Sequence, residues 1–156
     1  DASGQLTLQI NTRNPTLSTF SDDWAEAFSA HPDIPAAPFD DTVRVDISTL
    51  DVLIEAHGQP GFCKIDVEGF EDKVLAGLSV PIQAVSFEAF PLEVERSIRC
   101  VERLMALGRY QFRTVMAEQF RWADEDWMDA DAMVARLRAW ELEAGSGGVY
   151  ARLYSI

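Results

Sequence analysis

The chain has 156 residues, of which 47% are hydrophobic and 25% are charged. This composition is typical of one globular domain and excludes a disordered chain. Acidic residues outnumber basic ones by 26 to 13, and the net charge of −13 disfavours nucleic acid and anionic membranes as partners. The sequence shows neither a membrane-spanning apolar run nor a signal peptide, so we expect a cytoplasmic location. The cysteines lack metal-ligand spacing, and we predict no bound metal.

The N-terminal part of the chain predicts two strands around a short helix. Apolar residues alternate with polar ones over Leu6–Ile10 and again over Val43–Ile47, which is typical of half-buried strands that could pair with each other. Between them we predict a helix over Asp22–Ala30 and a proline-rich loop over His31–Asp41. The two strands are too far apart in sequence to form a tight hairpin.

Strands and helices then alternate to the end of the chain. A capping box at Ser48–Asp51 predicts a helix that ends at Gly58. Further helices are predicted over Phe70–Leu78, over Leu92–Leu107 and after a cap at Asp129. The predicted strands of this part are Phe62–Val67, Ala84–Phe87, Tyr110–Met116 and Gly148–Tyr154. This order predicts an α/β fold with a mostly parallel sheet and an antiparallel C-terminal strand.

Charged residues crowd the end of the strand that starts at Phe62. Because strand side chains alternate, Lys64, Asp66 and Glu68 project from one face. Strands of such sheets are usually apolar because both of their faces are covered, and a buried charge is costly unless it is paired or used. The carboxyl ends of the strands are also where open α/β sheets bind ligands. The pattern therefore favours a functional site over a merely wet strand face.

The residues that follow extend this polar cluster. Gly69 allows a sharp turn into the next helix, where Glu71 could simply complement the helix dipole. Glu88 ends the next strand, so two neighbouring strands deliver carboxylates to one edge of the sheet. Such a cluster could bind a substrate hydroxyl, a cation or the amino group of a cofactor.

Three chemistries suit an apolar strand that ends in Asp-x-Glu. One is methyl transfer from a sulfonium donor, and another is glycosyl transfer that depends on a metal ion held by the carboxylates. The third, phosphate hydrolysis through an aspartyl nucleophile, normally requires Asp-x-Asp followed by a small hydroxyl residue. The run Glu68-Gly69-Phe70 departs from that pattern, so we set the third chemistry aside.

Several motifs resemble one known family. The run Lys64–Glu71, KIDVEGFE, and the VLAGL that follows from Val74 resemble the central signature of FkbM-type S-adenosylmethionine-dependent methyltransferases. Thr49-Leu50-Asp51, Val85–Glu88 and the opening Gly4–Ile10 resemble flanking segments of the same family. The resemblance implies a class I, Rossmann-like methyltransferase fold, S-adenosylmethionine as cofactor and O-methylation of a small molecule, commonly a sugar or a polyketide-type hydroxyl.

The resemblance also suggests roles for the clustered residues. Asp66 is expected to contact the donor or orient the acceptor, and Lys64 or Glu68 to assist deprotonation of the hydroxyl. We therefore predict Lys64, Asp66 and Glu68 as catalytic residues, with Asp66 also binding the cofactor. Glu71 and Glu88 are the predicted substrate-binding residues.

The donor site is where the sequence departs from the family. The glycines before Phe62 do not form the glycine-rich turn that follows the first strand of such folds. We therefore expect residues 1–156 to be a single domain that represents the C-terminal portion of a methyltransferase domain, without the donor-binding strands. The strand containing Lys64 would then be an open edge, covered by Leu6–Ile10 or paired with another copy. An incomplete domain that serves interaction or oligomerisation is the alternative to an enzyme.

Overall fold

The computed structural model describes residues 3–30, 39–116, 121–141 and 145–154. Most of the predicted loop His31–Asp41 lies outside these ranges. The strands are β1 (Gly4–Ile10), β2 (Asp41–Ile47), β3 (Phe62–Ile65), β4 (Ala84–Ala89), β5 (Tyr110–Met116) and β6 (Gly147–Leu153). The α-helices are α1 (Asp22–Ala30), α2 (Leu50–His57), α3 (Glu71–Ala76), α4 (Val94–Leu107) and α5 (Ala130–Arg138). Two 3-10 turns, η1 (Pro15–Leu17) and η2 (Pro91–Glu93), complete the order.

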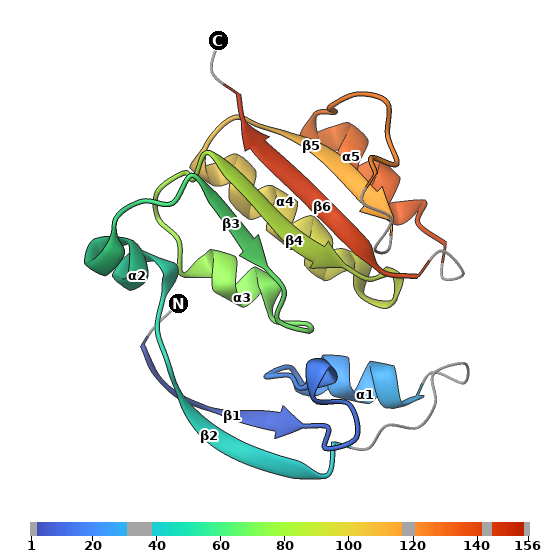
Figure 1. Ribbon diagram of the computed structural model, residues 1–156. Coiled ribbons are helices and arrows are strands. Elements are labelled where there is room, and N and C mark those ends of the chain that lie inside the picture. Colours follow the sequence, from blue (N-terminus) through green and yellow to red (C-terminus); the bar gives the residue numbers. More distant parts are fainter. Residues whose placement is uncertain (1–2, 31–38, 117–120, 142–144, 155–156) are drawn as a thin grey trace.

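The larger sheet has four strands in the order β3-β4-β6-β5 (Figure 1). β3 pairs with β4 in parallel, whereas β6 lies between β4 and β5 and is antiparallel to both. The predicted antiparallel C-terminal strand is thus confirmed. The pairing is mixed rather than mostly parallel, because β6 separates two strands that run in the same direction.

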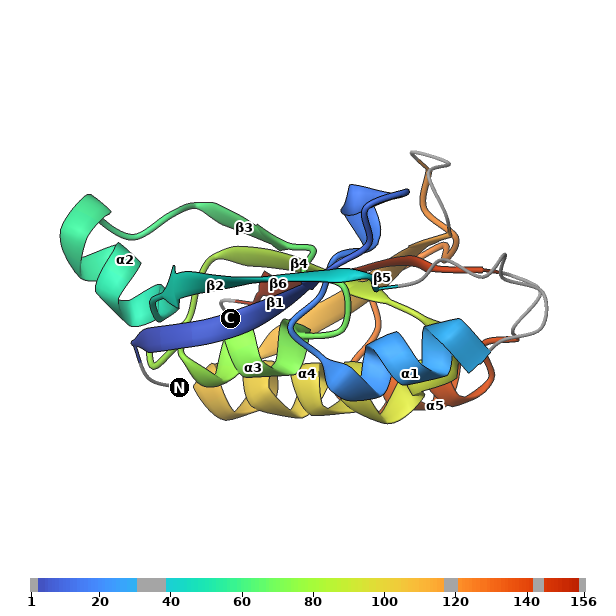
Figure 2. The same ribbon diagram turned by 90° about the horizontal axis from the view of Figure 1, so that it is seen from below.

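Helices α3, α4 and α5 cover one face of this sheet (Figure 2). The covered face is apolar and includes the fully buried Phe87, Phe112 and Val149. Leu104 of α4 and Leu137 of α5 belong to the same core. Within the described ranges, none of the helices is both long enough and apolar enough to cross a membrane.

β1 and β2 form a separate two-stranded antiparallel sheet, which confirms the predicted pairing of Leu6–Ile10 with Val43–Ile47. β1 pairs with β2 and not with β3 in the described chain, so Leu6–Ile10 does not extend the larger sheet at its open edge. The other expected arrangement, pairing with another copy, stays a prediction. β3 remains an edge strand, and its first residue, Phe62, is 51% exposed.

The cap of α2 differs from the predicted capping box. Thr49, not Ser48, caps the helix, and its hydroxyl accepts a hydrogen bond from the Val52 amide at 3.2 Å. Asp51 does not reach back to the cap, because its carboxylate accepts from the amide of Ser79 at 2.7 Å. Asp51 therefore ties α2 to the chain that follows α3.

Candidate functional site

The structure brings three predicted site residues together at the carboxyl ends of β3 and β4. Asp66, Glu68 and Glu88 each place a carboxylate oxygen within 4.8 Å of the other two. β3 and β4 are parallel, and their last paired residues are Ile65 and Phe87. Asp66 and Glu88 follow this pair in the sequence and therefore lie side by side. Lys64 lies beside them, and its Nζ donates to Asp66 Oδ2 at 2.7 Å. Both side chains of this ion pair are largely exposed.

The turn after β3 is held in an unusual conformation. Glu68 has a φ of +48° and Gly69 a φ of +94°. A Cβ atom on Gly69 would lie 2.5 Å from the Cβ of Trp24, so the turn needs glycine for space as well as for conformation. The Thr19 hydroxyl donates to the carbonyl of Glu68 from the N-terminal part of the chain. The predicted role of Gly69 in the sharp turn is confirmed.

Glu71 supports the same turn from inside the protein. Its side chain is 2% exposed, and Oε1 accepts from the amides of Val67 and Gly69, both at 3.3 Å. Its Oε2 lies 3.1 Å from Nε of Arg96, which also pairs with Glu93. The carboxylate of Glu71 lines the site but is engaged with protein groups, and its contact with substrate stays a prediction.

Arg96 lines the site but was not predicted as a site residue from the sequence. It projects from α4 and is 6% exposed, which is rare for arginine. Its spacing could have indicated this burial. Arg96 precedes the buried Cys100 and Leu104 by four and eight residues, so it lies on the same face of the helix. A charge on that face requires a partner, which Glu71 provides.

Burial and mutual repulsion change the protonation of the cluster. Burial, followed by the charges of Glu88, Asp66 and Glu71, raises the pKa of Glu68 to about 8. Burial and the charge of Asp66 also raise the pKa of Glu88, although a hydrogen bond from Ser146 opposes this shift. The hydrogen bond to Asp66 raises the pKa of Lys64.

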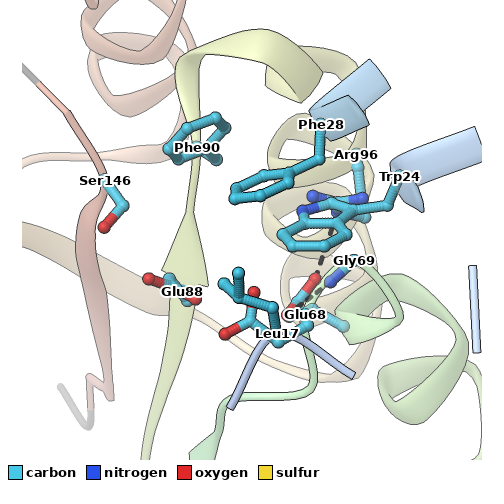
Figure 3. Close-up of a pocket in the computed structure, with 10 residues that line it drawn as sticks. Leu17, Trp24, Phe28, Glu68, Gly69, Glu88, Phe90, Arg96 and Ser146 are labelled. Atoms are coloured by element: carbon cyan, nitrogen blue, oxygen red, sulfur yellow. Dashed lines mark hydrogen bonds and ion pairs between the residues drawn. The ribbon is translucent and has the colours of Figure 1, made fainter. Parts of the chain in front are cut away.

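Two cavities open onto the carboxylates. The smaller, about 190 Å³, is walled by the aromatic rings of Trp24, Phe28 and Phe90, and Glu68 and Glu88 lie at its other side (Figure 3). Trp24 and Phe28 come from α1, so a helix distant in sequence completes this cavity. Apolar walls with a few polar groups are typical of small-molecule sites.

The larger cavity, about 490 Å³, also has Glu88 in its lining. Its lining includes Lys64, Asp66, Ser86 and Tyr150. Glu88 and Ser146 line both cavities, so the carboxylates stand between two spaces that ligands can enter. A group bound in one cavity and a group bound in the other would therefore meet at these carboxylates.

Comparisons with known proteins identify the relationship. The family model described as the methyltransferase FkbM domain matches residues 4–145. A search of the curated proteins found no match. The matched range includes both cavities' carboxylates and nearly all described helices and strands.

Proposed function

Because the chain belongs to the FkbM methyltransferase family, we propose that it serves methyl transfer from S-adenosylmethionine to a hydroxyl group of a small molecule, such as a sugar or a polyketide-like alcohol. The observation that supports this proposal best is the convergence of Asp66, Glu68 and Glu88 between two cavities at the strand ends. In this proposal the chain supplies the acceptor side of a class I, Rossmann-like active site.

The proposed acceptor site is the cavity walled by Trp24, Phe28 and Phe90. An apolar wall would hold the carbon skeleton, and the carboxylates of Glu68 and Glu88 would accept hydrogen bonds from its hydroxyl groups. Transfer to a hydroxyl requires that the oxygen be oriented and that its proton be removed. Glu68 lies in this cavity and is within 4.8 Å of the other carboxylates, which suits it to both tasks.

Lys64 and Asp66 face the larger cavity instead. We propose that their ion pair orients the reacting groups from that side, with Asp66 nearest to the donor. Glu71 would act through the turn that it holds, because its oxygens are engaged by the amides of Val67 and Gly69 and by Arg96.

S-adenosylmethionine supplies an electrophilic methyl group when it is bound. The described residues do not by themselves fit the glycine-rich cradle that holds this donor. Gly69 follows a core strand with a positive φ, but Trp24 fills the space against it. Gly145 precedes β6, and Gly147 and Gly148 are its first two residues, so none of the three lies in a turn that follows a strand. We therefore assign no donor contact beyond the proposed one at Asp66.

An assay of labelled-methyl transfer by the full-length gene product tests the proposal. Hydroxylated sugars and polyketide alcohols serve as acceptors, and Asp66→Ala and Glu88→Gln are compared with Glu102→Gln, an exposed site on α4. We expect the two cluster variants to lose about 10²-fold or more in kcat/KM, while the control keeps its rate. Unchanged turnover in both cluster variants would remove the assignment.

One observation favours a second candidate, an interaction module. Among the described residues, β3 is an edge strand that pairs on one side only, and Phe62 on it is half exposed. Such an edge can pair with a second copy of the chain. Sedimentation of the chain and of Phe62→Lys tests this candidate, which predicts a dimer that the substitution dissociates. A monomer at high micromolar concentration would exclude it.

A further inference from the structure

The three carboxylates are close enough together to share one divalent metal ion. Oxygen ligands lie 2.0–2.1 Å from Mg²⁺ and 2.3–2.6 Å from Ca²⁺, so two of them on one ion are at most about 4.2 Å apart for Mg²⁺ and about 5.2 Å apart for Ca²⁺. One oxygen each from Asp66, Glu68 and Glu88 lies within 4.8 Å of the others. The three residues come from two strand ends and a turn that is locked by Gly69 and Glu71, so the arrangement is built into the fold.

A second observation, at Ser86, points independently to a ligand. Ser86 is 3% exposed, and its Oγ has no hydrogen-bond partner among the residues that the structure describes. Ser86 precedes Glu88 by two positions on β4, so both side chains lie on the same face, and both line the larger cavity with Asp66. A buried hydroxyl without a partner is costly. A water molecule held by an ion beside Asp66 and Glu88 would provide the missing partner.

The charges of the neighbouring side chains agree with this inference. Three carboxylates at such short distances repel one another. The cations close to them are already engaged, since Lys64 pairs with Asp66 at the exposed rim and Arg96 pairs with Glu71 and Glu93. A divalent cation between the carboxylates would relieve the repulsion.

We propose that Asp66, Glu68 and Glu88 bind one hard divalent cation, with a cation-bound water hydrogen-bonded to Ser86. Ligands that are all oxygens select hard cations over zinc or copper. Three protein ligands would leave further coordination positions for water or an acceptor hydroxyl. This proposal differs from our expectation that the chain binds no metal.

Binding of Mn²⁺ to the whole chain tests the site without reference to methyl transfer. Calorimetry and electron paramagnetic resonance in physiological salt should show one saturable Mn²⁺ per chain. We expect Glu88→Gln and Asp66→Asn to weaken binding about tenfold or more, and Ser86→Ala to weaken it about fivefold. Glu102→Gln changes an exposed carboxylate of α4 and should alter binding less than about twofold.

A second measurement on the unsubstituted protein covers the case in which a variant fails to fold. Bound Mn²⁺ should broaden the amide signals of Ser146 and Gly148, which line the larger cavity, more than that of Leu153 at the other end of β6. Weak, non-saturating binding, equal loss in Glu102→Gln, or uniform broadening would show attraction to the acidic surface only and would overturn the proposal. Because these readouts need no methyl donor, a failure here is distinct from a failure of the proposed methyl transfer.

Discussion

Replacing Arg96 by methionine removes the cation that faces Glu71 inside the protein. The two side chains are 7% and 2% exposed, and Nε and Oε2 lie 3.1 Å apart. Breaking a buried ion pair from one side costs about 3–5 kcal/mol, because the remaining charge stays buried without its partner. Methionine fills much of the space of arginine, so little of this cost comes from lost packing. We therefore expect Arg96→Met to lower the free energy of unfolding by about 3–5 kcal/mol.

Urea unfolding followed by tryptophan fluorescence measures this loss, with the m-value checked for two-state behaviour. The double variant Glu71→Gln, Arg96→Met supplies the control. The side-chain oxygen of the glutamine at position 71 can still accept from the amides of Val67 and Gly69, whereas both buried charges are gone. We expect the double variant to regain about 2 kcal/mol relative to Arg96→Met. A cost below about 1 kcal/mol for Arg96→Met, or no recovery in the double variant, would refute the role of the pair.

Two further predictions concern the turn after β3. Gly69→Ala should destabilise the protein by more than about 3 kcal/mol in thermal unfolding, because its Cβ would lie 2.5 Å from Trp24 at a φ of +94°. Gly61→Ala is the control, and its stability should change little because Gly61 has open space around it. Similar melting temperatures for both variants would contradict the close packing. The pKa of Glu68 is raised from 4.5 to about 8, so its contribution to stability is greatest below pH 4.5 and is lost as the pH rises through 8. Since the side chain is partly exposed, we expect a loss of about 1–2 kcal/mol in metal-free buffer, which Glu68→Gln should abolish; equal pH slopes in both proteins would contradict it.

Local chemistry predicted several elements well. Asp129 accepts a hydrogen bond from the amide of Ala132 and caps α5, as its position before the helix indicates. Gly58 ends α2 with a φ of +87°. The convergence of Asp66 and Glu88 also followed from the sequence, because consecutive parallel strands bring their carboxyl ends to one edge.

Features that depend on long-range packing were not predictable in this way. Thr49 and Ser48 are equivalent as caps by chemistry, and the contact of Asp51 with Ser79, 28 residues away, removes Asp51 from the capping box. The insertion of β6 between β4 and β5 depends on pairing across the whole sheet. Arg96 reaches Glu71 only because α3 packs against α4, and no local pattern shows which helices will be neighbours.

The most direct test of methyl transfer to a hydroxyl group follows a ¹³C-labelled methyl group from S-adenosylmethionine into the product. Carbon NMR distinguishes a methoxy group from a methyl group on nitrogen or carbon. We expect a methoxy signal on a small-molecule acceptor with the full-length gene product, and loss of that signal in Glu88→Gln. A methyl group on nitrogen or carbon, or an undiminished methoxy signal in the variant, would contradict the assignment of these carboxylates to a hydroxyl acceptor.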